Sequence, residues 1–257
     1  MPDERPLILL TNDDGIHAEG LLRLKEIAGA LGEVVIVAPD TEQSAVGHSI
    51  TLYDPIKAHE VYKDGVLYGF SIGGTPADSV KLALHYLLPR KPRLVISGIN
   101  NGANVGINVL YSGTVSAATE AAILGVPSIA VSIAAKRNPP FENVSPFVTK
   151  IAAWVLKNNL PSGVALNLNV PALPPDQIKG LKVTRQSLER FQETFERRED
   201  PRGNSYYWLS GESIASIDEE GVDIFCLKEG FASVTPLYYD LTAHKHTEEL
   251  ACALTQI

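Results

Sequence analysis

The chain has 257 residues, of which 45% are hydrophobic and 20% charged, and its formal net charge is −8. This length suits an α/β core with a sizeable excursion, and the acidic balance argues against duplex nucleic acid or an anionic membrane as a partner. The chain has no apolar run of the ~20 residues that a membrane span needs, no signal-peptide pattern, and only two cysteines, Cys226 and Cys252. We therefore expect a cytoplasmic protein whose thiols are reduced.

The first predicted element is a strand over residues 7–10, four aliphatic residues that lead directly to Asn12, Asp13, Asp14 and Gly15. An unbroken apolar run is typical of a strand that is covered on both faces, as at the centre of a parallel sheet. Ligands collect outside the carboxyl ends of such strands, so these polar residues are expected at the mouth of a crevice. Two adjacent carboxylates favour a divalent cation beside them. The alternative is that one aspartate only caps the next helix.

Strands and helices then alternate as far as residue 171, which predicts a Rossmann-like α/β fold, a mostly parallel sheet with helices on both faces. Short hairpins over residues 50–70 are expected to lie over the core. The expected strands cover residues 34–38, 94–98, 128–132 and 164–170, and the expected helices cover residues 20–31, 76–88, 111–125 and 146–157.

Beyond Pro171 the alternation ends, and charged and aromatic residues become more frequent. We expect residues 172–240 to form a β-hairpin excursion that contacts a second subunit, with a lid or flap as the alternative. Residues 241–257 are expected to form a C-terminal helical tail. The predicted plan is therefore a catalytic core over residues 1–171, an oligomerisation excursion and a tail within one structural domain.

Three strand ends bring oxygen-bearing side chains to one edge of the predicted sheet. Asp13 and Asp14 follow the first strand, Ser44 the second and Asn100 the third. Singly, Ser44 is typical of a loop and Asn100 of a turn, but together with the aspartates they make an oxygen-only set. Such a set needs no His or Cys and predicts one Mg²⁺ or Mn²⁺ ion.

The helix that begins at Ser112, Gly113 and Thr114 follows the third of these strands. We expect the free N–H groups from Gly113 to Ser116 to bind an anion. A phosphate between this helix and the metal would be hydrolysed by a water that the ion activates. His48, four residues after Ser44, has two interpretations: it faces the substrate, or it bonds to loop backbone.

Several motifs occur in order along the chain. They are Thr11-Asn12-Asp13-Asp14-Gly15, Gln43-Ser44, Gly74-Thr75-Pro76-Ala77-Asp78, Ser97 to Asn104 and Tyr111 to Ala118. Together they resemble the SurE family of survival-protein nucleotidases. The resemblance implies a divalent-metal-dependent phosphatase that acts on nucleoside 5′- and 3′-monophosphates and, in some members, on short polyphosphate. It implies metal ligands at Asp13, Asp14, Ser44 and Asn100, and homodimers or homotetramers that exchange C-terminal segments.

The leading hypothesis is a phosphomonoesterase in which Asp13 and Asp14 act as the catalytic, metal-binding pair. Its expected substrate-binding residues are Asn12, Asn104, Ser112, Gly113 and Thr114. The alternative is a non-catalytic sensor of a nucleotide or a divalent ion. A dehydrogenase is disfavoured, because the first strand is not followed by the Gly-Xaa-Gly-Xaa-Xaa-Gly pattern that holds a pyrophosphate.

Overall fold

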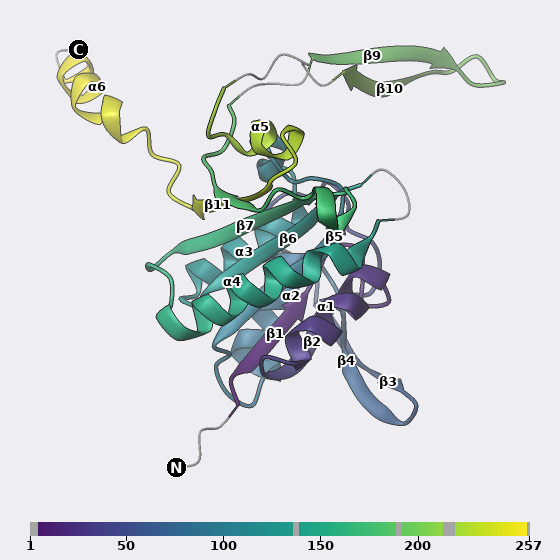
Figure 1. Ribbon diagram of the computed structural model, residues 1–257. Coiled ribbons are helices and arrows are strands. Elements are labelled where there is room, and N and C mark those ends of the chain that lie inside the picture. The colour runs from purple at the N-terminus through teal and green to yellow at the C-terminus, as the bar shows by residue number, and fades with distance from the viewer. Residues whose placement is uncertain (1–4, 136–138, 189–191, 213–218, 256–257) are drawn as a thin grey trace.

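The computed structural model describes residues 5–135, 139–188, 192–212 and 219–255, and Figure 1 shows them around a central sheet. Within these residues the sheet has nine strands in the order β3-β4-β2-β1-β5-β6-β7-β11-β8. Its central strands β2, β1, β5, β6 and β7 are parallel. The strands of this sheet are β1 (Leu7–Thr11), β2 (Glu33–Pro39), β3 (Lys57–Lys63), β4 (Val66–Gly73), β5 (Leu94–Asn101), β6 (Ser128–Ala134), β7 (Val164–Pro171), β8 (Leu181–Val183) and β11 (Ala232–Tyr238).

Helices cover both faces of this sheet, because successive residues of the central strand point to opposite sides. Ile8 and Leu10 of β1 belong to the core cluster beneath α1 (Glu19–Gly29) and α4 (Ser145–Asn158). Leu9 belongs to the cluster beneath α2 (Pro76–Leu82) and α3 (Gly113–Ile123). Figure 1 shows the two helix layers on either side of the sheet. The predicted Rossmann-like α/β fold is confirmed.

Two local predictions were wrong. The hairpin β3–β4 does not lie over the core but extends the edge of the sheet, where β4 pairs in parallel with β2. Gly69 makes this pairing possible, because a Cβ at that position would lie 2.6 Å from the carbonyl oxygen of Ile36. The other error concerns Asn100, which does not follow its strand: β5 shifts register after Ser97 and then pairs Asn100 with Ser132 of β6.

The C-terminal third contributes to the sheet and also leaves it. Strand β11 pairs antiparallel with β7 and parallel with β8. Strands β9 (Gln192–Glu199) and β10 (Ser205–Glu212) form a separate two-stranded hairpin that reaches away from the sheet, as does α6 (Thr247–Leu254) (Figure 1). The division into a core, an excursion and a tail stays a prediction. Across the described residues, no helix has the length and apolar character to span a bilayer.

Candidate functional site

A cleft of about 630 Å³ opens at the carboxyl ends of the central strands, on the edge of the sheet where the sequence predicted a site. The predicted metal ligands Asp13, Ser44 and Asn100 line it, together with the predicted substrate residues Asn104 and Ser112. Its remaining lining residues are Ala45, Ala103, Asn108, Tyr111 and Leu209. Segments that are far apart in sequence therefore converge on one cavity. The roles of these residues as ligands stay predictions.

Asp13 is buried at the floor of this cleft and is held by the first turn of α3. The hydroxyl of Thr114 donates to Asp13 Oδ1 at 2.5 Å, and the backbone N–H of Thr114 donates to Oδ2 at 3.0 Å. Gly113 lies so close that an added Cβ would be 2.8 Å from the Cβ of Asp13. Burial raises the pKa of Asp13 above its ordinary value, although the hydrogen bonds from Thr114 oppose this shift.

Asp14 is half-buried beside Asp13 but is not among the residues that line the cleft. Burial, together with the charges of Asp13 and Glu42, raises the pKa of Asp14 to about 6. Sequence reasoning missed Glu42, a third carboxylate in this neighbourhood. Three acidic groups that follow the neighbouring strands β1 and β2 and act on one another repel unless a cation is present.

The cleft has the chemistry of a site for a hard cation. Its polar lining consists of a carboxylate, hydroxyls and amides, and none of its lining residues is lysine, arginine or histidine. Asn100 donates its amide nitrogen to the carbonyl oxygen of Gly102 at 2.8 Å, which leaves its own side-chain oxygen available as a ligand. No group of three or more His, Cys, Asp or Glu side chains that could hold a metal occurs among the described residues. Because the polar lining offers oxygen donors and no His or Cys, the donor set fits Mg²⁺ or Mn²⁺ rather than Zn²⁺.

Asn12 is fully buried next to this set and does not line the cleft. Its amide nitrogen donates to the carbonyl oxygen of Gly15 at 2.9 Å. Its side-chain oxygen has no hydrogen-bond partner among the described residues. Asn12 therefore shapes the turn after β1, and its predicted contact with the substrate stays a prediction.

The start of α3 differs from the expected open anion site. Thr114 N–H bonds to Asp13, Val115 N–H donates to the Ser112 hydroxyl at 3.1 Å, and Ser116 N–H donates to the Ser112 carbonyl at 3.0 Å. The expectation that the N–H groups from Gly113 to Ser116 are all free was therefore wrong. A helix N-terminus satisfies its first N–H groups with side chains wherever suitable ones are adjacent, and here Ser112 and Asp13 are.

The loop that carries Ser44 is tied to the rest of the site at several points. Gln43 N–H donates to the carbonyl oxygen of Asp13 at 2.7 Å, and Gly47 N–H donates to that of Tyr111 at 3.1 Å. The Ser44 hydroxyl donates to the carboxylate of Glu42. Further along, the hydroxyl of Thr51 donates to the buried carboxylate of Asp78 at 2.6 Å.

His48 is a further anchor of this loop. Its Nε2 lies 2.8 Å from Oε2 of Glu120 on α3, and Lys81 Nζ lies 2.7 Å from the other carboxylate oxygen. Glu120 is 4% exposed. Burial alone would raise the pKa of Glu120, but the hydrogen bonds and charges of His48 and Lys81 hold it below its ordinary value. In the structure, His48 therefore has a buried carboxylate as its partner rather than loop backbone.

A buried hydrogen-bond network holds the segment between β5 and α3. Asn104 N–H donates to the side-chain oxygen of Asn169 at 2.8 Å, and its side-chain amide donates to the hydroxyl of Ser132 at 2.9 Å. Two residues further on, Gly106 N–H donates to the fully buried carboxylate of Asp223 at 2.9 Å. The Asn104 side chain that was predicted to contact substrate is thus fixed from β6.

Some residues of the site were not predicted, because their contacts join segments that are far apart in the sequence. Asp223 lies 117 residues from its partner Gly106, and no local pattern identifies that pairing. Leu209 lies in β10, within the excursion that was expected to contact a second subunit. Glu120 had a visible signal, because it is the single charged residue in the small-residue helix Gly113–Ile123.

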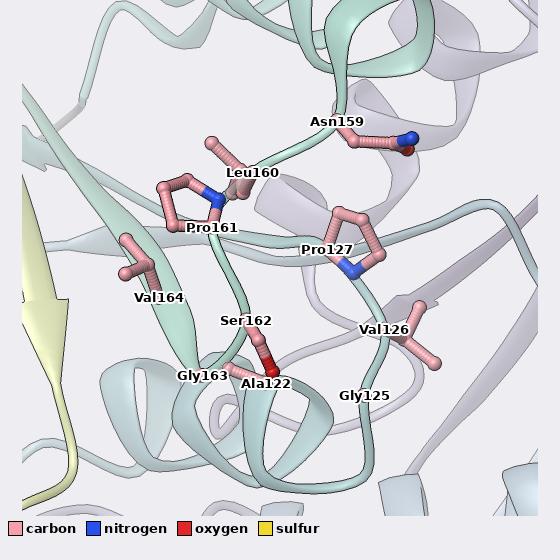
Figure 2. Close-up of a pocket in the computed structure, with 10 residues that line it drawn as sticks. All are labelled: Ala122, Gly125, Val126, Pro127, Asn159, Leu160, Pro161, Ser162, Gly163 and Val164. Carbon is pink, nitrogen blue, oxygen red and sulfur yellow. The ribbon is translucent and has the colours of Figure 1, made fainter.

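A second hollow, of about 330 Å³, lies at the amino ends of the parallel strands, where the segments leading into β6 and β7 meet. Figure 2 shows Asn159 and Ser162 among proline, glycine and aliphatic residues around it. None of its lining residues is acidic, basic, histidine or cysteine. It therefore lacks the groups needed for metal binding or for acid–base chemistry.

Comparison with known proteins agrees with the resemblance of the motifs. The family model described as "Survival protein SurE" matches residues 8–193. The 5′-nucleotidase SurE of Syntrophobacter fumaroxidans is 48% identical over 95% of this chain and 97% of its own length, and that of Moorella thermoacetica is 49% identical over 97% and 96%. The crystal structure of the SurE protein from Aquifex aeolicus superimposes with a TM-score of 0.84 and 42% identity, covering 95% of this chain and 98% of that one. With a family model and curated relatives matched over most of its length, the protein belongs to the SurE family.

Proposed function

We propose that this protein is a phosphomonoesterase of nucleoside 5′-monophosphates that works with one divalent ion, Mg²⁺ or Mn²⁺, per subunit. The observation that carries the proposal is the convergence of Asp13, Ser44 and Asn100 on one cleft that has no basic side chain in its lining. An anionic phosphate would be repelled by such a cleft unless a cation occupied it. The relatives named 5′-nucleotidase SurE support the nucleotidase part of this proposal.

In this proposal Asp13, Asp14, Ser44 and Asn100 hold the ion. When bound, the ion would polarise the phosphoryl group and lower the pKa of a water molecule. Thr114 holds the carboxylate of Asp13 in one orientation through two hydrogen bonds. Asn104 and Ser112 line the same cleft and supply an amide and a hydroxyl to the remaining phosphate oxygens.

The proposal extends to hydrolysis of nucleoside 3′-monophosphates and of short polyphosphate. A site that binds mainly a phosphate and a metal tolerates several leaving groups. We also propose a homodimer or homotetramer that exchanges C-terminal segments. Support for this assembly comes from large hydrophobic side chains that are exposed on the hairpin and tail, such as Phe195, Trp208, Leu250 and Leu254.

The experiment is phosphate release from AMP by the wild-type chain and by Asp14→Ala, with Mg²⁺ or Mn²⁺ and after EDTA treatment. We expect activity that requires the metal, and at least about a 100-fold loss in Asp14→Ala, because losing a ligand exceeds the 10–100-fold cost of disturbing a ligand's support. His85→Ala, on an exposed helix face away from the cleft, is the control. Wild-type turnover in Asp14→Ala would refute the metal assignment, and saturable AMP binding without product would favour the sensor.

A further inference from the structure

The cleft changes character from its floor to its rim. At the floor lie Asp13, Asn100 and Ser112, which are polar. At the rim lie two large hydrophobic side chains, Tyr111 and Leu209, which are 53% and 61% exposed. A polar floor with an apolar rim matches a ligand that has a charged end and a flat, largely apolar end.

Tyr111 has a fixed backbone and a free ring. Its N–H donates to the carbonyl of Asn108 at 3.1 Å, and its carbonyl accepts from Gly47 N–H at 3.1 Å. Among the described residues its hydroxyl makes no hydrogen bond, and the ring is not needed for the core. It directly precedes Ser112, the residue that caps α3 at the floor of the cleft. Tyr111 and Ser112 line the same cleft, so the ring lies next to the residue that is proposed to bind the phosphate.

Leu209 comes from the hairpin, on a different part of the chain. It pairs with Phe195 across the two strands, so both side chains lie on the same face of the hairpin, while Trp208 lies on the other face. Leu209 is the hairpin residue that lines the cleft, so the hairpin, although it reaches away from the sheet, contributes a side chain to the site. The face of the hairpin that carries Trp208 is left for other contacts.

We infer that Tyr111 and Leu209 form a subsite for the nucleobase of the substrate, with Asn108 within the same cleft for the edge of the base. The inference rests on the proposed function and names the part of the nucleotide that the metal ligands do not contact. A base stacked on an aromatic ring gains ~1–3 kcal/mol whichever base it is. The subsite therefore favours nucleotides over other phosphate esters and discriminates weakly among bases.

The test compares AMP with ribose 5-phosphate, which has the same phosphate and sugar but no base. In Tyr111→Ala we expect the ratio of kcat/KM for AMP to that for ribose 5-phosphate to fall about 5- to 150-fold, the equivalent of one lost stacking contact. Tyr111→Phe, which keeps the ring, should retain the wild-type ratio within about twofold. Leu209→Ala should lower the ratio by less, since it removes contact area but no ring.

Tyr86→Ala removes a tyrosine that is 82% exposed and lies outside the cleft, and serves as the control. An unchanged ratio in Tyr111→Ala, or a Tyr111→Phe variant as defective as Tyr111→Ala, would overturn the inference. If wild-type protein with metal hydrolyses neither ester, the proposed function fails. The base subsite is then judged by calorimetry, from the ratio of the Kd values for AMP and ribose 5-phosphate in the same variants.

Discussion

The floor of the cleft and the loop that carries Ser44 are held in place in different ways. The floor includes Asp13 and Asn104, buried residues in the segments that follow β1 and β5, and hydrogen bonds within the core fix both of them. The opposite wall is the loop that carries Ser44, and most of its residues are half-buried or exposed. This loop keeps its place through a few polar anchors, such as the contact of His48 with Glu120.

The difference suggests how the two walls respond to change. The floor is continuous with the hydrophobic core, so a substitution there disturbs the geometry of the site and the stability of the fold together. The loop depends on single hydrogen bonds, so losing one anchor should alter the position of Ser44 while the fold persists.

Among the variants that compare the floor with the loop, the largest effect is expected for Gly113→Ala at the floor. The new Cβ would lie 2.8 Å from the Cβ of Asp13 and 3.0 Å from its Oδ2, so Asp13 or the start of α3 must move. A displacement approaching 1 Å at a reacting group costs up to about 100-fold in rate. We expect kcat/KM for AMP to fall by at least about 10-fold, measured by phosphate release at saturating metal.

Gly29→Ala is the matched control, because it makes the same chemical change at the last residue of α1, where an added Cβ meets no heavy atom within 4 Å apart from its chain neighbours and the backbone of its own helix. It should leave activity unchanged and stabilise the protein by up to about 1 kcal/mol, since alanine restricts the unfolded chain. Equal activity of the two variants would show that the floor is not rigid.

The sequence was sufficient to predict the parts of this site that depend on local patterns. The aliphatic run ending in Asp13 and Asp14 predicted a buried central strand with carboxylates at its end, and Ser44 and Asn100 were placed on the same edge. The position of Asn100 within β5 was missed, because a register shift in the ladder with β6 leaves no mark in composition. The partners of His48 and Gly106 were missed because each contact joins segments that are 72 or 117 residues apart.

An intermediate effect is expected for Asp223→Asn, behind the floor. The carboxylate of Asp223 accepts the N–H groups of Gly106, Ser187 and Ile224 at 2.8–3.0 Å. An amide has one oxygen in place of two and adds buried donors, so at least one backbone N–H loses its partner. This should lower the free energy of unfolding by ~1–3 kcal/mol in a urea titration.

Asp176→Asn, an exposed aspartate in the same part of the chain, should change the free energy of unfolding by no more than about 0.5 kcal/mol. If the two variants were equally stable, the network around Asp223 would not support the floor.

The smallest effect on stability is expected for Glu120→Gln, which weakens the anchor of the Ser44 loop. The variant keeps the shape of the side chain but loses its charge toward Lys81 and His48, so we expect a loss of about 1 kcal/mol at neutral pH. Because the proposed ligand Ser44 lies on the anchored loop, the metal concentration needed for half-maximal activity should rise by up to about 10-fold. Glu19→Gln, on the exposed face of α1, is the control for both measurements.

The dependence of the unfolding free energy on pH distinguishes the contribution of the Glu120 carboxylate from a general effect of charge. The pKa of Glu120 in the folded protein lies below its ordinary value of 4.5, so the folded state favours the ionised carboxylate. The stability that this carboxylate contributes is therefore fully present above pH ~4.5 and is lost as the pH falls through the folded-state pKa. The difference in unfolding free energy between wild type and Glu120→Gln should be present at pH 5 and shrink in more acidic solution. A difference that stayed the same at acidic pH would mean that the ionised carboxylate of Glu120 is not what anchors the loop, and the contrast between a packed floor and a charge-anchored loop would have to be given up.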